Sequence, residues 1–167
     1  NSDNVNYILC MPGDFFKCNG IRLLKKRVYI SSWSFSRYIF KKKYDRDVVY
    51  GDAFLFGKGN EIMYKKTWEN SGIKNIIFVH NSELYGEKFE NRYGIRTDSI
   101  IIPSKNSFDS RTQILGQIIE SAKGKLDLLI LISAGPCAKY LVKQLALNGF
   151  WAIDTGHCWD EPLSLME

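Results

Sequence analysis

Ionisable residues gather near the C-terminal end of the chain. Within eight positions lie Asp154, His157, Asp160 and Glu161. Carboxylates in such a cluster can bind a cation or accept a proton, and histidine can act as a ligand or as a proton carrier. The alternative is that Asp154 caps a turn, His157 is a turn histidine with satisfied partners, and the other two acids are solvated. The residue types alone leave both interpretations open.

A glycine turn stands upstream of this cluster. Residues 126–133 are almost unbroken aliphatic, which is typical of a strand buried on both faces of a parallel sheet. Gly135 and Pro136 then end the strand and begin a helix, since proline is tolerated in a first helical turn. The free N–H groups of the helix would face the carboxyl end of the strand, where they could bind a phosphate. A plain strand-to-helix turn is the alternative, because the turn lacks a further glycine fingerprint.

The helix after this turn leads into the polar cluster. One buried stripe is expected on it at the i, i+3, i+4 spacing, formed by Ala138, Leu141, Val142, Leu145 and Ala146. Gly149 is the expected left-handed residue at its end. Residues 150–153 then form another short buried strand, so the cluster should follow a strand at the carboxyl edge of the sheet.

The rest of the chain alternates between strand and helix patterns. Strands are predicted at residues 6–11, 52–56, 74–80 and 99–102. Helices are predicted at residues 34–43 and 61–69. A third predicted helix is capped by Asn106 or Ser107 and ends at Ala122. Strands separated by helices favour parallel pairing with crossover connections. The sequence therefore predicts an α/β fold, a Rossmann-like and mostly parallel sheet with helices on both faces, as one domain over residues 1–167.

Composition narrows the class of protein. The 167 residues are 45% hydrophobic and 25% charged, as in a soluble globular protein. No apolar run approaches the roughly 20 residues of a transmembrane helix, and residues 1–10 do not show the basic start and apolar core expected of a signal peptide. We expect a cytoplasmic location.

The cysteines do not predict a zinc site. Cys10, Cys18, Cys137 and Cys158 form no CxxC pair and no finger-like spacing with the two histidines. Buried free thiols in a reducing compartment are the simpler expectation. A catalytic role for Cys158 is disfavoured, because no second histidine lies close to it in sequence.

The net charge of +5 includes two basic runs, at residues 25–27 and 41–43. Such runs can be a solvated face, a patch for anionic lipid or nucleic acid, or a surface that steers an anionic substrate. The second run ends an aromatic helix that could rest on a membrane surface. No helix-turn-helix, RNP-like or KH-like signature is present, so no nucleic-acid partner is expected.

Residues 135–157, GPCAKYLVKQLALNGFWAIDTGH, resemble the signature of the GT-D type glycosyltransferases, a bacterial family first catalogued as a domain of unknown function. Its usual form is Gly-Pro-Thr-Ala, a helix, a glycine and Ala-Ile-Asp-Ile-Gly-His. Cys137 stands where threonine is common, and Thr155 where isoleucine is. Weaker matches at residues 50–54, Trp68 and residues 106–108 extend the resemblance over most of the chain.

The resemblance implies transfer of a sugar from a nucleotide donor, such as a UDP-hexose, to a glycan on a protein or lipid carrier. The family is described as metal-dependent, with an Asp-x-Glu motif shortly after Gly-His. Glu161 matches that glutamate, whereas Trp159 occupies the aspartate position and Asp160 the middle. Either Asp160 with Glu161 coordinates Mn²⁺ or Mg²⁺ in a shifted geometry, or the metal role is lost. The family's N-terminal Arg-x-Gly-Asp-Gly-Glu segment also has no counterpart in this sequence. This difference is expected if the chain is a fragment or a divergent member of the family.

Site roles follow from this resemblance. A cation held by carboxylates would stabilise the departing diphosphate. Backbone groups of Gly135, Pro136 and Cys137, with the charge of Lys139, would add to that stabilisation. His157 could be a ligand, a donor to the diphosphate or a turn anchor. The candidates for the base of an inverting reaction are Asp154, Asp160 and Glu161.

Two other classes of protein stay open. One is a different Rossmann-like enzyme, such as a methyltransferase, although the lack of a GxGxxG motif counts against dinucleotide binding. The other is a non-catalytic GT-D-like domain that binds a glycan or a partner protein. If the chain is the enzyme, we expect it in the cytoplasm or peripherally at the inner face of the membrane.

Overall fold

The computed structural model describes residues 7–11, 18–25, 30, 34–69 and 71–167. The chain divides into two compact units. Residues 8–55 form the smaller unit, and residues 1–7 with 56–167 form the larger one. The larger unit holds the sheet and all of the site residues predicted from the sequence.

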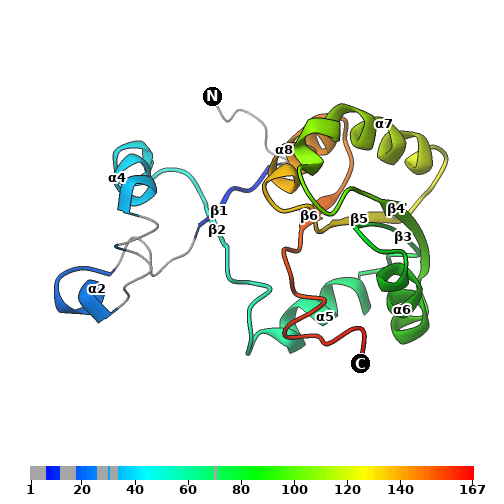
Figure 1. The fold of residues 1–167 in the computed structure, drawn as a ribbon, viewed down its shortest axis with the longest axis horizontal. Helices are drawn as coiled ribbons and strands as arrows, with labels where there is room; N and C mark the ends of the chain where they lie inside the picture. Colours follow the sequence, from blue (N-terminus) through cyan, green and yellow to red (C-terminus); the bar gives the residue numbers. More distant parts are fainter. Residues whose placement is uncertain (1–6, 12–17, 26–29, 31–33, 70) are drawn as a thin grey trace. The chain divides into compact units, whose positions relative to one another are not determined.

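The larger unit is built on a four-stranded parallel sheet in the order β4-β3-β5-β6 (Figure 1). The strands are β3 (Asn75–His80), β4 (Arg96–Ile101), β5 (Leu128–Ile132) and β6 (Ala152–Asp154). The central pair, β3 and β5, is buried over most of its length, which explains the continuous apolar runs in the sequence. Val79 pairs with Ile132, and Ile132 pairs with Asp154. The strands therefore bring their following loops to one edge.

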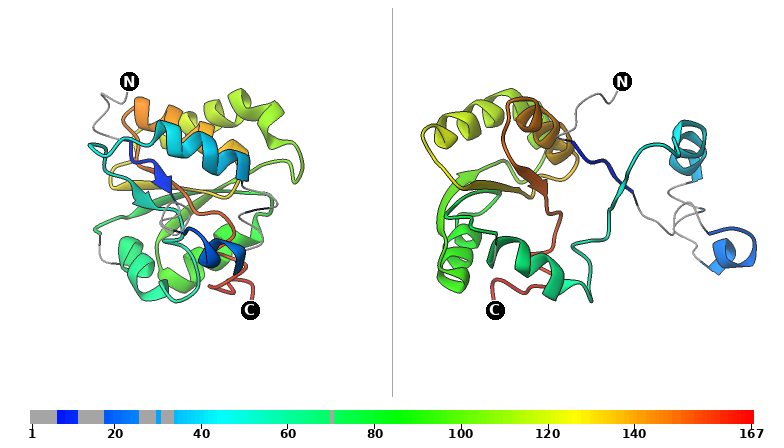
Figure 2. Two further views of the ribbon diagram at one scale, coloured as in Figure 1. Left: turned by 90° about the vertical axis from the view of Figure 1, so that its left-hand side faces the viewer. Right: turned by 180° about the vertical axis from the view of Figure 1, so that it is seen from behind.

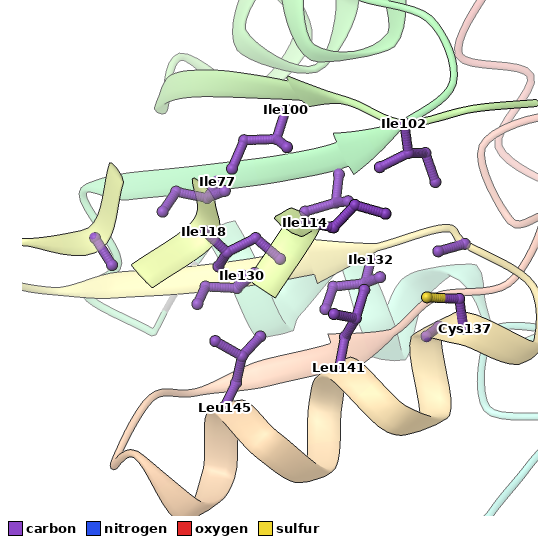
Figure 3. Packing of buried hydrophobic residues seen from close by; sticks show 14 residues of the cluster. Ile77, Ile100, Ile102, Ile114, Ile118, Ile130, Ile132, Cys137, Leu141 and Leu145 are labelled. Carbon is purple, nitrogen blue, oxygen red and sulfur yellow. The ribbon is translucent and has the colours of Figure 1, made fainter. Parts of the chain in front are cut away.

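Helices α7 (Arg111–Ala122) and α8 (Pro136–Leu147) cover one face of the sheet, here called the aliphatic face (Figures 1 and 2). A short 3-10 helix, η1 (Ser107–Ser110), precedes α7. Figure 3 shows the packing, in which strand side chains meet Ile114 and Ile118 of α7 and Leu141 and Leu145 of α8. Burial of each side chain of this size contributes roughly 1.5–3 kcal/mol to the stability of the fold.

The opposite face is here called the aromatic face. It is covered by α5 (Glu61–Glu69), α6 (Leu84–Tyr93) and the segment 158–165 (Figure 2). Trp159 lies at its centre and is fully buried. Its ring centroid lies 4.9 Å from that of Phe78 and 5.5 Å from that of Trp68, and it meets Phe89 edge to face at 5.6 Å. Such tilted and edge-on pairs are the favoured aromatic geometries.

The described residues of the smaller unit form two short strands and two helices. β1 (Cys10–Met11) pairs in parallel with β2 (Gly51–Asp52). The helices are α2 (Ile21–Lys25) and α4 (Ser34–Lys43), and neither contains a buried residue. None of the helices in the described part of the chain has the length and apolar character needed to span a bilayer.

The predicted fold class is confirmed, as are the helices at residues 34–43 and 61–69. The strand predicted at residues 52–56 is wrong beyond Asp52, because the Asp52 carboxylate accepts the Phe54 N–H at 2.9 Å and begins a turn there. The strand predicted at residues 6–11 pairs only at Cys10–Met11, and Asn6 lies outside the described residues. Helix α6 was not predicted. The single domain expected over residues 1–167 stays a prediction.

Candidate active site

The candidate site lies at the carboxyl edge of the sheet in the larger unit. From β3 the chain passes through α6 to β4 on one side, and from β5 it passes through α8 to β6 on the other. The loops after β3 and β5 therefore diverge, which creates the switch point where open α/β sheets bind ligands. The Ser133 N–H donates to the carbonyl oxygen of Val79 at 2.9 Å, so these two loops start side by side.

A buried hydrogen-bond network fixes the loops after β5 and β6. The Trp159 indole N–H lies 2.9 Å from Ser133 Oγ and 3.1 Å from Thr155 Oγ1. The Thr155 hydroxyl donates to the Ile132 carbonyl oxygen at 3.2 Å, which leaves the Ser133 hydroxyl to donate to Thr155 Oγ1 at 3.0 Å. Every donor in this network has an acceptor, so the segment after β6 is held against the end of β5.

Four ionisable side chains meet beside this network. The Tyr85 hydroxyl donates to Asp160 Oδ1, and the His157 Nδ1 lies 3.8 Å from Asp160 Oδ2. The His80 ring packs on the Tyr85 ring at a centroid distance of 3.9 Å. The segment after β3 and the polar cluster near the C-terminus, far apart in sequence, thus form one group.

The surroundings set the protonation of this group. Burial lowers the pKa of His80, and the Asp160 carboxylate opposes that effect. A neutral imidazole agrees with the Ser82 N–H, which donates to His80 Nδ1 at 3.3 Å. The hydrogen bond to Asp160 raises the pKa of Tyr85 to about 12, so Tyr85 stays a hydrogen-bond donor at neutral pH.

The strand-end carboxylate Asp154 has its own partners. Its Oδ1 accepts the Gly156 N–H at 3.1 Å, and its Oδ2 lies 3.1 Å from the Lys139 ammonium group. Asp154 therefore caps the turn as well as pairing with a cation from the first turn of α8. The Lys139 side chain is 73% exposed and so can turn toward a ligand.

The turn between β5 and α8 presents its backbone to the same edge. Gly135 has φ 54° and ψ −134°, a conformation that disfavours any residue with a Cβ atom. The Cys137 and Ala138 N–H groups already donate to the carbonyl oxygens of Ala134 and Gly135. Among the described residues, the Ala134 and Gly135 N–H groups have no acceptor and remain available to an anion.

The cysteines predicted to be buried thiols are placed in the core, with one exception. Cys137 is 1% exposed and lies within the aliphatic cluster (Figure 3), and its N–H already donates to the Ala134 carbonyl oxygen. The contact of Cys137 with a cofactor stays a prediction. Burial raises the pKa of the Cys158 thiol to about 12, which agrees with an inert role. Cys10 is the exception and is exposed.

The predicted metal ligands Asp160 and Glu161 are adjacent in a turn, where both N–H groups donate to the His157 carbonyl oxygen. Within the part of the chain that the structure describes, no three side chains of His, Cys, Asp or Glu are grouped as a metal cage. Two carboxylates nevertheless suit Mg²⁺ or Mn²⁺, because such ions are commonly held by one or two carboxylates together with substrate phosphates. Trp159 cannot contribute a ligand, since it is fully buried.

The structure groups the predicted residues in two pairs, Asp154 with Lys139 and Asp160 with His157. Four further site residues were not singled out from the sequence, namely His80, Tyr85, Ser133 and Thr155. His80 could have been found, because it ends a buried strand at the ligand-binding edge. The hydroxyl pair carries no sequence signal apart from its position at strand ends.

The chain matches the family model of the glycosyltransferase GT-D fold over residues 1–162, and it belongs to that family. The resemblance seen in the sequence is thereby confirmed. No match was found among curated proteins.

Solved structures share the fold. One is described as a new glycosyltransferase (DUF1792) from Streptococcus sanguinis, with 26% identity, a TM-score of 0.62, and coverage of 92% of this chain and 62% of that chain. Another is a domain of unknown function 1792 described as having a distinct glycosyltransferase fold, with 23% identity, a TM-score of 0.68, and coverage of 92% and 60%. A selenomethionine-substituted structure of the same domain gives the same values. The chain thus spans about three fifths of the length of these proteins.

Proposed function

We propose that the protein is a glycosyltransferase that moves a sugar from a nucleotide donor, a UDP-hexose, to a glycan on a protein or lipid carrier. Family membership supports the class of reaction. The polar edge of the sheet at the switch point between β3 and β5 supports the location of the active site. The single observation that carries the proposal is the grouping of the family signature with carboxylates and with the Ala134 and Gly135 N–H groups at this edge. We further propose that the enzyme works in the cytoplasm.

The donor diphosphate is proposed to bind at the turn between β5 and α8. The Ala134 and Gly135 N–H groups supply hydrogen bonds, and the N-terminus of α8 adds a favourable dipole. Lys139 supplies a positive charge when it turns from Asp154 toward the diphosphate. His157, with a side chain 91% exposed, can donate a further hydrogen bond from the opposite loop.

Asp160 and Glu161 are proposed to hold Mn²⁺ or Mg²⁺ together with the diphosphate oxygens. A cation there would neutralise the charge of the leaving group. Tyr85 fixes the orientation of Asp160 through its hydrogen bond, so one carboxylate is positioned before a ligand arrives. This assignment leaves Asp154 as the carboxylate that accepts the proton of the acceptor hydroxyl in an inverting reaction.

A second candidate is a non-catalytic GT-D domain that binds a glycan or a partner protein. The observation that favours it is Trp159, which occupies the motif's aspartate position and is committed to the core. This candidate predicts a folded protein without affinity for nucleotide diphosphates.

Calorimetric titration separates the two candidates. UDP and UDP-glucose would be titrated into the protein with Mn²⁺ and with EDTA, and again with the variants Asp160→Asn and Glu161→Gln. We expect Mn²⁺-dependent binding that either variant weakens at least about tenfold, since even groups behind metal ligands have effects of that size. Glu120→Gln on α7 is the matched control, because the Glu120 carboxylate is exposed and its partner among the described residues is the neighbouring Lys123. Absence of nucleotide binding to the folded protein would overturn the proposed function.

A further inference from the structure

The positive charge of the protein is concentrated in the smaller unit. Residues 8–55 contain ten Lys and Arg residues and four Asp residues, a net charge of +6. The whole chain has a net charge of +5, so the rest of the chain carries −1. The basic character is therefore a property of one unit and not of the donor site.

Helix α4 combines this charge with exposed apolar side chains. Phe35, Tyr38, Ile39 and Lys42 follow the i, i+3, i+4, i+7 spacing and share one face. Their apolar members are 76%, 55% and 40% exposed, in that order. The Lys42 ammonium lies 4.4 Å from the centre of the Tyr38 ring, where its charge borders the apolar surface.

A different side of α4 makes the contacts within the unit. Arg37 donates to Asn19 Oδ1 at 2.9 Å and Lys41 donates to the same atom at 3.3 Å. These polar contacts leave the Phe35, Tyr38 and Ile39 face turned outward, and no residue of α4 is buried. A ten-residue helix without a buried face has marginal stability in water. We therefore expect this face to be covered by a binding partner.

Helix α2 repeats the combination on a smaller scale. Ile21 and Leu24 are 75% and 67% exposed, and Arg22 and Lys25 beside them are also exposed. Apolar groups bordered by lysine and arginine match the boundary between acyl chains and anionic headgroups. A nucleic acid would use the charges but would leave the aliphatic side chains in water.

We propose that the Phe35, Tyr38, Ile39 and Lys42 face of α4 binds the surface of an anionic phospholipid bilayer. The aromatic and aliphatic side chains enter the headgroup boundary, and Lys42 and Lys43 reach the anionic headgroups along their flexible stems. The inference does not rest on the proposed glycosyl transfer, because it concerns the smaller unit alone.

Vesicle flotation tests the proposal with the full chain. The vesicles are phosphatidylcholine alone or phosphatidylcholine mixed with phosphatidylglycerol. We expect binding only to the mixed vesicles and a loss of binding at high salt, because electrostatic attraction is screened. Two double variants test the helix, Phe35→Ser with Ile39→Ser, and Lys42→Glu with Lys43→Glu. Each should lower the affinity at least about tenfold.

Matched controls lie on α5 in the larger unit. Ile62→Ser with Met63→Ser removes two exposed apolar side chains, and Lys65→Glu with Lys66→Glu makes the same change of net charge. Both controls should float like the unaltered protein, and circular dichroism checks that every variant is folded. Three results would overturn the proposal: equal loss of binding in the test and control variants, equally strong binding to vesicles of pure phosphatidylcholine, or no binding to any vesicle. The last result is the one expected if the face binds an acidic protein instead.

Discussion

The two faces of the parallel sheet are covered in different ways. The aliphatic face is packed by two full helices, α7 and α8, whose side chains follow a regular period. The aromatic face is packed by α5, α6 and the irregular segment 158–165. Both faces stabilise the unit, and on the aromatic face a large core side chain, Trp159, also forms hydrogen bonds with the loops of the site.

Trp159 makes this difference concrete. Its ring packs against Phe78 and Phe89, and its N–H lies within hydrogen-bond distance of Ser133 and Thr155. The family motif has a carboxylate at this position, whereas in this chain the tryptophan there connects the core to the loops of the site. The neighbouring Asp160 and Glu161 then emerge from a fixed turn.

The largest effect is expected from Trp159→Ala, which should lower the free energy of unfolding by about 3–5 kcal/mol. Trp159→Phe keeps most of the packing but removes the N–H donor, and should cost about 1–3 kcal/mol while also weakening UDP binding. Leu145→Ala on the aliphatic face is the control and should cost about 2–5 kcal/mol without changing UDP affinity. Urea unfolding and calorimetry measure the two quantities. An equal loss of UDP affinity in Leu145→Ala would remove the distinction between the faces.

Gly135→Ala should sharpen the comparison at the edge of the aliphatic face. No atom of the described residues lies within 4 Å of the added Cβ, so the effect comes from the backbone conformation at φ 54°. We expect a loss of about 1–3 kcal/mol in unfolding free energy and a weaker affinity for UDP. The Cβ added by Gly116→Ala on α7 also meets no atom within 4 Å in the part of the chain that the structure describes. The φ of Gly116 is ordinary, so this variant should not be destabilised. Similar losses in both variants would contradict this account of the turn.

His80 links the aromatic side of the site to pH. Its pKa is lowered by burial from 6.5, so near that pH the unfolded chain binds a proton that the folded protein does not. Stability should therefore be full above pH 6.5 and should fall as the pH drops below it. His80→Asn should flatten this slope in urea unfolding measured across that range, whereas His157→Asn, at a side chain 91% exposed, should keep it. An unchanged slope in His80→Asn would assign the pH dependence to other groups.

Lys139→Ala should have the smallest effect on stability. The pair with Asp154 is exposed at Lys139, and such pairs contribute at most about 1 kcal/mol. The same variant should weaken UDP binding, which separates a ligand-binding role from a structural one. Lys143→Ala, further along α8, is the control and should leave both quantities unchanged. Full UDP affinity in Lys139→Ala would remove this lysine from the donor site.

The aliphatic half of the fold could be predicted from the sequence. The stripes containing Ile114 and Ile118 on α7 and Leu141 and Leu145 on α8 repeat with the helical period, and β5 is a continuous apolar run. The aromatic half was less accessible. Helix α6 buries only Gly86 and Phe89, so its sequence shows no clear stripe, and segment 158–165 has no period at all.

The sequence predicted where the site lies in the fold, but it predicted only some of the residues that form the site. Asp154, Asp160 and His157 could be placed because they follow a predicted strand. The contribution of Tyr85 could not, because its contact with Asp160 joins residues 75 positions apart. The burial of Trp159 could not be predicted from the sequence either, because there the residue was noticeable only as a departure from the family motif.

The most direct test of the central claim is amide NMR of ¹⁵N-labelled protein titrated with UDP and Mg²⁺. A donor site at the carboxyl edge predicts shifts concentrated at the Ala134, Gly135 and Gly156 amides, with Gly149 at the opposite edge unchanged. Shifts confined to residues away from this edge, or no shifts at all, would contradict the claim that the GT-D signature of this chain forms a nucleotide-sugar site.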